Sequence, residues 1–140
     1  MQFEPHLSFN GQCESAFGFY EKCLGGSISL MLRYGESPFP GQAPPRLRDK
    51  ILYAVLVLGN QRLTGSDASP EHYLKMQGFP VTLVIDDTVE AERIFRELAQ
   101  NGSVEMPLQE TFWATRFGVL VDQFGTPWEI NCWKGDTAHQ

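Results

Sequence analysis

An internal repeat constrains the fold of this 140-residue chain more than any other feature of its sequence. Residues 13–26 align with residues 89–102, and residues 53–57 (Tyr-Ala-Val-Leu-Val) align with residues 117–121 (Phe-Gly-Val-Leu-Val). The matched residues of the first pair include Glu14 with Glu90, Phe19 with Phe95, Glu21 with Glu97 and Gly26 with Gly102. Because both matches occur in the same order along the chain, they indicate a duplicated unit.

The spacing of apolar residues predicts the same order of elements in each half. Alternation with a period of two is typical of strands, and a period near 3.6 is typical of helices. We expect helices over residues 13–24 and 89–100, the second with Thr88 as its N-cap. We expect strands over residues 3–10, 27–34, 50–58, 61–66, 79–86, 104–112, 116–122 and 127–133. The sequence thus predicts an α+β fold of two βαβββ repeats, with a curved mixed sheet around a cleft and helices on the outer face.

The repeat also predicts the domain organisation. Residues 1–134 should form a single domain, with repeats over about residues 1–67 and 79–134, and residues 135–140 should form a polar tail. The proline-rich stretch from Gly35 to Asp49 has no counterpart in the second half and reads as a long loop. Two roles stay open for this loop: it closes over the cleft or packs across a dimer.

Charge and hydropathy exclude several classes of protein. Lys and Arg number 11 against 17 Asp and Glu, a net charge of −6, and no basic stripe offers a surface for nucleic acid. The longest apolar run, Ile51 to Leu58, is too short to span a membrane. The three cysteines form no CxxC motif, and the first residues show no export signal. A reduced, cytoplasmic setting is therefore expected.

Strand parity predicts which side chains face away from the helices. Successive residues of a strand point to opposite faces of the sheet. The residues expected on the face opposite the helices are mostly polar or small, and they come from four strands: His6 and Ser8; Thr64 and Ser66; Pro80, Thr82 and Val84; Glu129 and Asn131. A cleft lined by these groups is a candidate functional site.

Three stretches of the chain, together with the repeat, resemble a known superfamily. They are residues 10–20 (Asn-Gly-Gln-Cys-Glu-Ser-Ala-Phe-Gly-Phe-Tyr), residues 65–67 (Gly-Ser-Asp), and residues 109–113 (Gln-Glu-Thr-Phe-Trp) followed by residues 122–128 (Asp-Gln-Phe-Gly-Thr-Pro-Trp). Over nearly its whole length the chain is similar to the vicinal oxygen chelate superfamily, which includes glyoxalase I, extradiol dioxygenases and the bleomycin resistance proteins. Within that superfamily it resembles the PhnB-like subgroup.

The resemblance implies a metal site on inward-facing strand positions. His6 and Glu129 match two of the four ligand positions of the superfamily, and Thr64 and the segment Pro80 to Thr82 stand at the other two. A divalent zinc, nickel, manganese or iron ion would then polarise the vicinal oxygens of a small substrate, with His6 and Glu129 as catalytic residues. An enzyme of this kind would be a lyase, an isomerase or a transferase.

Other interpretations of these residues stay open. The chain is alternatively a binding module that sequesters a small apolar or aromatic ligand without metal, or an interaction protein with no pocket ligand. Phe112 and Trp113 are candidates for the lining of a ligand site, and Arg116 is a candidate for binding an anionic group. Thr64, Thr82 and Asn131 are candidates for polar contacts with a ligand. Core packing, a dimer contact and a solvated surface are the structural alternatives. A homodimer is expected in every case, because open sheet edges need cover.

Overall fold

The chain forms two compact units, Met1–Lys75 and Met76–Gln140, each made of one four-stranded sheet and one helix. The structure is a computed structural model that describes residues 1–38 and 43–135. The expected polar tail therefore lies almost entirely outside the described residues, as does the middle of the loop from Gly35 to Asp49. The predicted α+β architecture of two βαβββ repeats is confirmed.

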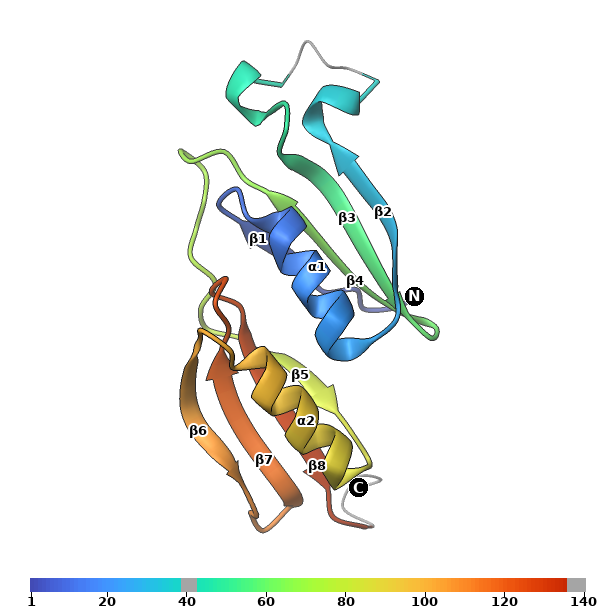
Figure 1. The fold of residues 1–140 in the computed structure, drawn as a ribbon, viewed down its shortest axis with the longest axis vertical. Helices are drawn as coiled ribbons and strands as arrows, with labels where there is room; N and C mark the ends of the chain where they lie inside the picture. The colour runs from blue at the N-terminus through green and yellow to red at the C-terminus, as the bar shows by residue number, and fades with distance from the viewer. Residues whose placement is uncertain (39–42, 136–140) are drawn as a thin grey trace. The chain divides into compact units, whose positions relative to one another are not determined.

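The first unit contains the strands β1 (His6–Phe9), β2 (Ser27–Arg33), β3 (Ile51–Leu58) and β4 (Gln61–Asp67), and the helix α1 (Cys13–Leu24). The strands lie in the order β1-β4-β3-β2, with β1 parallel to β4 and the other pairs antiparallel. Figure 1 shows α1 lying across one face of this sheet. Two short 3₁₀ helices, Tyr34–Glu36 and Pro45–Leu47, interrupt the expected loop.

The second unit repeats this arrangement with β5 (Val81–Val84), α2 (Thr88–Leu98), β6 (Ser103–Gln109), β7 (Ala114–Val121) and β8 (Pro127–Trp133). Its strand order is β5-β8-β7-β6, and β5 is parallel to β8. Helix α2 lies across one face of this second sheet (Figure 1). Among the described residues, neither helix has the length and apolar character needed to cross a membrane.

In each unit the helix packs on the sheet where a glycine leaves room for a phenylalanine ring. A Cβ atom on Gly65 of β4 would lie 2.6 Å from Phe17 Cε1 of α1, and one on Gly118 of β7 would lie 2.7 Å from Phe95 Cε2 of α2. Phe17 is fully buried and Phe95 nearly so. Close packing of this kind tolerates no added methyl group without a shift of the ring or the strand.

A buried carboxylate ties the first unit together. Asp67, at the end of β4, accepts hydrogen bonds from the backbone N–H groups of Cys13 and Ile51, each at 2.9 Å. These two donors begin α1 and β3, so one side chain satisfies the start of a helix and of a strand. In the second unit Asp122 accepts from the N–H groups of Phe124 and Thr126 and from Trp128 Nε1.

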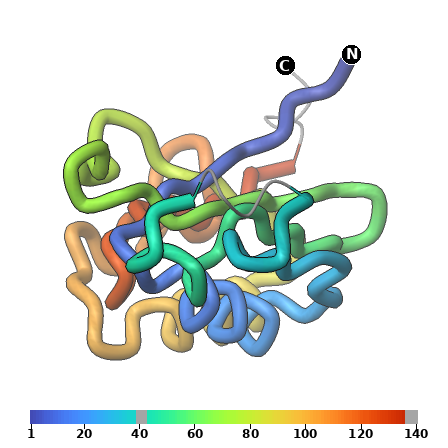
Figure 2. The backbone as a smooth tube through the Cα atoms, turned by 90° about the horizontal axis from the view of Figure 1, so that it is seen from above, coloured from blue at the N-terminus to red at the C-terminus, as the bar shows by residue number. Residues whose placement is uncertain are grey.

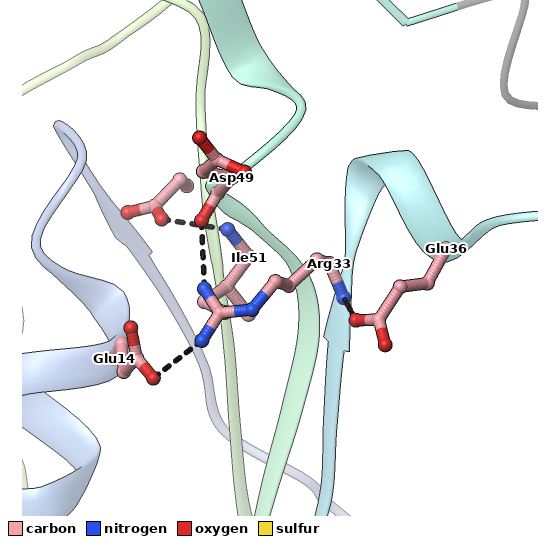
Figure 3. Close-up of polar contacts among 6 residues, drawn as sticks. Glu14, Arg33, Glu36, Asp49 and Ile51 are labelled. Carbon is pink, nitrogen blue, oxygen red and sulfur yellow. Dashed lines mark hydrogen bonds and ion pairs between the residues drawn. The ribbon is translucent and has the colours of Figure 1, made fainter.

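Arg33 braces the end of β2 on the surface of the first unit (Figure 3). Its guanidinium donates to Glu14 Oε2 of α1 at 2.6 Å and to the carbonyl oxygen of Asp49 at 2.7 Å. Its backbone N–H donates to Glu36 Oε1 at 3.0 Å. The side chain therefore links α1 to the end of the long loop, and the backbone N–H binds Glu36 near the start of the loop.

Several predicted boundaries are wrong, for local reasons. Strand β1 starts at His6, and Phe3 is fully exposed although the alternating pattern placed it on a buried face. The N-terminal segment, dark blue in Figure 2, instead runs away from the sheet. Helix α2 is capped by Asp87, whose side chain accepts from the Val89 N–H at 3.2 Å, so Thr88 is the first helical residue and not the cap.

Candidate functional site

His6 and Thr64 face each other across the parallel pair β1 and β4, where they are register partners. The His6 ring bridges two hydroxyl groups of β4: Nδ1 lies 2.7 Å from Thr64 Oγ1, and Nε2 lies 3.0 Å from Ser66 Oγ. Thr64 and Ser66 are two residues apart on one strand, so their side chains share one face of the sheet. The parallel register thus holds the imidazole between them.

The hydrogen bonds around Thr64 decide which ring nitrogen of His6 carries the proton. The Thr64 hydroxyl has a single hydrogen, and it donates this hydrogen to the carbonyl oxygen of Pro5 at 2.9 Å. It must therefore accept from Nδ1–H of His6. The neutral ring then has a lone pair at Nε2, and the Ser66 hydroxyl donates to it.

The environment of His6 favours its neutral form. Partial burial lowers the pKa of His6 below its ordinary value of 6.5, and the nearby Glu4 carboxylate acts in the opposite direction. The ring of Tyr53, on β3, lies 5.4 Å from the imidazole centroid to centroid. Because the Nδ1 contact is part-buried and the Nε2 contact is exposed, the basic nitrogen is on the solvent side.

The second unit places a matching pair at the same point of its fold. Thr82 of β5 and Glu129 of β8 are register partners in the parallel pair, as His6 and Thr64 are in the first unit. The Thr82 hydroxyl donates to Glu129 Oε2 at 3.1 Å. The symmetry counterpart of His6, expected between Pro80 and Thr82, is therefore Thr82.

The second unit contains a buried amide and, next to it on the neighbouring strand, the first ring of an aromatic cluster. Asn131 of β8 is 5 % exposed, and its Oδ1 atom has no hydrogen-bond partner among the described residues. Its register partner on β7 is Phe117, whose ring lies 5.2 Å from that of Trp113. Phe112 is largely exposed and packs edge-on against Trp113, with the two ring centroids 4.8 Å apart. Asn131 carries an unmet acceptor beside an apolar surface.

Arg116 lies apart from these groups. It is the register partner of Cys132, on the side of the sheet that α2 covers, and its Nε donates to Glu92 Oε1 of that helix at 3.1 Å. Nη1 donates to the carbonyl oxygen of Thr115 at 2.7 Å. These contacts link α2 to β7, and the expected contact of Arg116 with an anionic group stays a prediction.

All three cysteines, Cys13, Cys23 and Cys132, are buried. Burial raises the pKa of the Cys13 thiol and that of the Cys132 thiol. A thiol with a raised pKa is a poor nucleophile and a poor metal ligand near neutral pH.

The described residues of neither unit make a complete metal site by themselves. In the described part of the chain, neither unit gathers three or more His, Cys, Asp or Glu side chains in a metal-binding arrangement. The partners of His6 and Glu129 within their units are hydroxyl groups. Catalytic zinc sites usually take three protein ligands with nitrogen, sulfur or carboxylate donors. The donor set of each unit therefore does not fit such an ion.

Ser66 and Tyr53 lie beside His6, and the sequence predicted a role for neither. Ser66 was expected on the same face of the sheet, because it shares the strand parity of Thr64. Tyr53 had no such signal in the sequence, because the register between β3 and β4 decides which side chain of β3 lies beside the imidazole. Phe117 was missed for the same reason, since its pairing with Asn131 depends on the register of β7 and β8.

Comparison with known proteins identifies relatives over almost the whole chain. Protein YjdN of Escherichia coli (strain K12) is 35% identical over 142 aligned positions, which cover 96% of this chain and 97% of the relative. The crystal structure of protein PA1353 from Pseudomonas aeruginosa has 43% sequence identity and a TM-score of 0.88, covering 96% of this chain and 99% of that one.

A more distant structure shares the fold, and a family model matches the sequence. A putative 3-demethylubiquinone-9 3-methyltransferase, PhnB protein, from Bacillus cereus has 23% identity and a TM-score of 0.79, covering 94% of this chain and 99% of that one. The model of the family described as 3-demethylubiquinone-9 3-methyltransferase matches residues 1–131. The chain therefore belongs to this family, the PhnB-like group of the vicinal oxygen chelate superfamily.

Proposed function

We propose that this chain is a small-molecule enzyme of the glyoxalase-like type in which His6 transfers a proton. The observation that carries the proposal is the orientation of the imidazole by Thr64, which leaves a lone pair at Nε2 on the exposed side of the ring. A general base needs a neutral, fixed ring with an accessible nitrogen. The resemblance to the vicinal oxygen chelate superfamily implies the substrate class, a small molecule with oxygen atoms on two neighbouring carbons.

In this proposal each partner of His6 has a separate task. Nε2 accepts a proton from the substrate. The Nδ1–H group keeps its hydrogen bond to Thr64, and this bond fixes the orientation of the ring. The Ser66 hydroxyl donates a hydrogen bond to Nε2 until a substrate displaces it. General base catalysis of this kind contributes about 10²- to 10⁴-fold to a rate.

A thermal-shift screen tests the proposal. The probes are small molecules with adjacent oxygens, such as catechol, hydroxyacetone and lactate, added to the wild type and to His6→Gln in the presence of a chelator. We expect at least one probe to raise the melting temperature of the wild type and to lose that effect in His6→Gln. Equal stabilisation of both proteins by every active probe would contradict the role of His6.

The metal role of His6 and Glu129, which the resemblance implies, is a separate proposal with its own measurement. Calorimetric titration of zinc, nickel, manganese and iron(II) into the wild type, His6→Ala and Glu129→Gln measures it directly. A metal enzyme requires that both variants bind the ion more weakly than the wild type. Equal weak binding by all three proteins would remove the metal from the mechanism.

Asn131 favours a second candidate function, a binding module for a planar apolar ligand. Its buried Oδ1 lacks a hydrogen-bond partner among the described residues. Phe117 is the register partner of Asn131, and its ring contacts Trp113, which in turn contacts Phe112. A ligand with one N–H or O–H donor on a flat ring would satisfy the amide and stack on the rings.

Indole and phenol are suitable probes for this candidate. The test variant is Asn131→Leu, which replaces the buried amide by an apolar side chain. Without ligand, Asn131→Leu should keep or raise the stability, because it removes an unmet buried acceptor. Stabilisation by indole or phenol should then be smaller than in the wild type. A probe that stabilises Asn131→Leu and the wild type to the same degree would rule out this surface.

The expected homodimer also remains a proposal. Sedimentation equilibrium over a range of protein concentrations measures it, and a single species with the mass of one chain would contradict it.

A further inference from the structure

We propose that Ser66 is a nucleophile that His6 activates, so that the first unit has serine acyl-transfer activity toward activated esters. The inference rests on the proposed role of His6 as a general base and extends it to a covalent step. A serine hydroxyl is a weak nucleophile unless an adjacent base takes its proton. Ser66 and His6 have that relation in this structure.

The geometry supplies the three groups that such a site requires. Ser66 Oγ lies 3.0 Å from Nε2 of His6, within hydrogen-bond distance of the base. Nδ1 of the same ring lies 2.7 Å from Thr64 Oγ1, which is itself held by its hydrogen bond to the Pro5 carbonyl. A nucleophile, a base and a third group that orients the base are the recurring arrangement of serine acyl-transfer sites on unrelated folds.

The backbone on both sides of Ser66 is anchored. Gly65 packs directly against the ring of Phe17, and Asp67 accepts hydrogen bonds from two backbone N–H groups. Ser66 itself is half-buried, and its contact with Nε2 is exposed. The hydroxyl is therefore held in place by a rigid strand and still open to a small ester.

A second serine–histidine contact in the same unit lacks this organisation and serves as an internal control. Ser69 Oγ lies 2.6 Å from Nδ1 of His72, three residues along an exposed connection after β4. Ser69 also hydrogen-bonds the carboxylate of Glu71. Since Ser69 has two competing acceptors for its one hydrogen, it should not react as Ser66 does.

The proposed step balances with an ester and water alone. Ser66 Oγ forms a bond to the acyl carbon, its proton moves to Nε2 of His6, and the bond from the acyl carbon to the leaving oxygen breaks. The proton then passes from Nε2 to the leaving alkoxide or phenolate, which departs as the alcohol or phenol. Water attacks the acyl-serine, the carboxylic acid leaves, and Ser66 regains its proton.

Reaction with p-nitrophenyl acetate tests the proposal. Stopped-flow absorbance follows the release of nitrophenolate, and peptide mass spectrometry after acid quenching locates the acetyl group. We expect a wild-type burst with acetylation of Ser66, no burst in Ser66→Ala, and a burst rate about a hundredfold lower in His6→Gln. The matched control Ser69→Ala should react as the wild type does.

Three results would overturn the proposal: no acetyl group on Ser66, equal labelling of Ser66 and Ser69, or a burst rate unchanged by His6→Gln. Should Ser66→Ala fail to fold, Ser66→Cys keeps a nucleophile at this position and must be acetylated there. Failure of this proposal is distinguishable from failure of His6 as acid–base group. If Ser66 is not acetylated while His6→Gln still loses the thermal shift with the small-molecule probes, only the serine nucleophile is excluded.

Discussion

The two units share one backbone plan and differ in the side chains that they place on it. In each unit, the parallel pair of the first and fourth strands brings a threonine hydroxyl against one titratable side chain. The first unit has the titratable residue, His6, on its first strand and the threonine, Thr64, on its fourth. The second unit reverses the order, with Thr82 on the first strand and Glu129 on the fourth.

This reversal separates what the repeat provides from what the sequence of each half adds. Strand order and register decide that these two positions meet, whatever residues occupy them. The residue types then decide the chemistry, because an imidazole exchanges protons near neutral pH and a carboxylate near pH 4. We therefore expect proton transfer from the first unit and ligand contacts from the aromatic surface of the second.

The largest expected effect concerns the buried carboxylates that hold each unit together. Asp67→Ala leaves the N–H groups of Cys13 and Ile51 without their acceptor, and Asp122→Ala does the same to two N–H groups and an indole in the other unit. Each change should lower the free energy of unfolding by about 3 kcal/mol or more.

Urea denaturation monitored by circular dichroism measures this loss. Asp67→Asn is the matched control, because it keeps one acceptor oxygen and should lose less. A loss below about 1 kcal/mol in Asp67→Ala would show that the first unit does not depend on this carboxylate.

The next effect compares the glycines that follow the two helices. A Cβ atom on Gly26 would lie 2.3 Å from the carbonyl oxygen of Val57, and one on Gly102 would lie 2.4 Å from that of Val121. Gly26 also has a φ of +79°, in the left-handed region, whereas the turn after α2 places its positive φ, 58°, on Asn101.

Gly26→Ala and Gly102→Ala should therefore each lower the free energy of unfolding by about 2 kcal/mol, because of the steric clash. Gly26→Ala should cost about 1 kcal/mol more than Gly102→Ala because of its backbone conformation. Melting temperatures of the two variants, measured under the same conditions, test the order. A larger loss in Gly102→Ala would reverse the comparison.

A smaller effect distinguishes the two threonines. Thr64 is 1 % exposed and makes hydrogen bonds to His6 and Pro5, so Thr64→Val should lower the free energy of unfolding by about 1 kcal/mol. Thr82 is exposed, and Thr82→Val should change the free energy of unfolding by less than about 0.5 kcal/mol. Chemical denaturation of both variants measures the difference, and equal losses would contradict it.

The smallest effect is the pKa of His6, which NMR titration of its ring protons measures. Because burial lowers this pKa and Glu4 raises it, we expect a value below 6.5, and a still lower one in Glu4→Gln. Between the lowered native pKa and 6.5 the unfolded chain binds more protons than the native one. This contribution to stability is therefore complete above pH 6.5 and is lost as the pH falls through that window. A native pKa above 6.5 would contradict the environment described.

Local sequence patterns were sufficient to predict the helices and strands that form most of the two cores. The bounds of α1 and β8 match their predictions, because the apolar spacing of a helix packed on one side, and the alternation of a strand within a sheet, are local signals. Short strands were predicted less well. β1 and β5 are shorter than expected, since alternation continues past the last residue that finds a partner strand.

The candidate site was predictable only in part, and His6 shows why. The alternation of side chains along a strand predicts which face of the sheet His6, Thr64 and Ser66 occupy. This prediction requires no knowledge of the partner strand. Its hydrogen bonds follow from the register of β1 with β4, which brings together residues 58 and 60 positions apart. Arg116 illustrates the converse, because a sequence pattern does not reveal that Glu92 lies close enough to bind it.

The sequence by itself determined that the chain is a duplicated βαβββ unit of the vicinal oxygen chelate superfamily, because repeat, periodicity and motif are properties of neighbouring residues. Only the tertiary structure decided which nitrogen of His6 is basic and which hydroxyl lies against it. The proton on Nδ1 depends on the acceptor to which the Thr64 hydroxyl donates its one hydrogen. That acceptor is the carbonyl oxygen of Pro5, which precedes β1 and is far from Thr64 in the sequence.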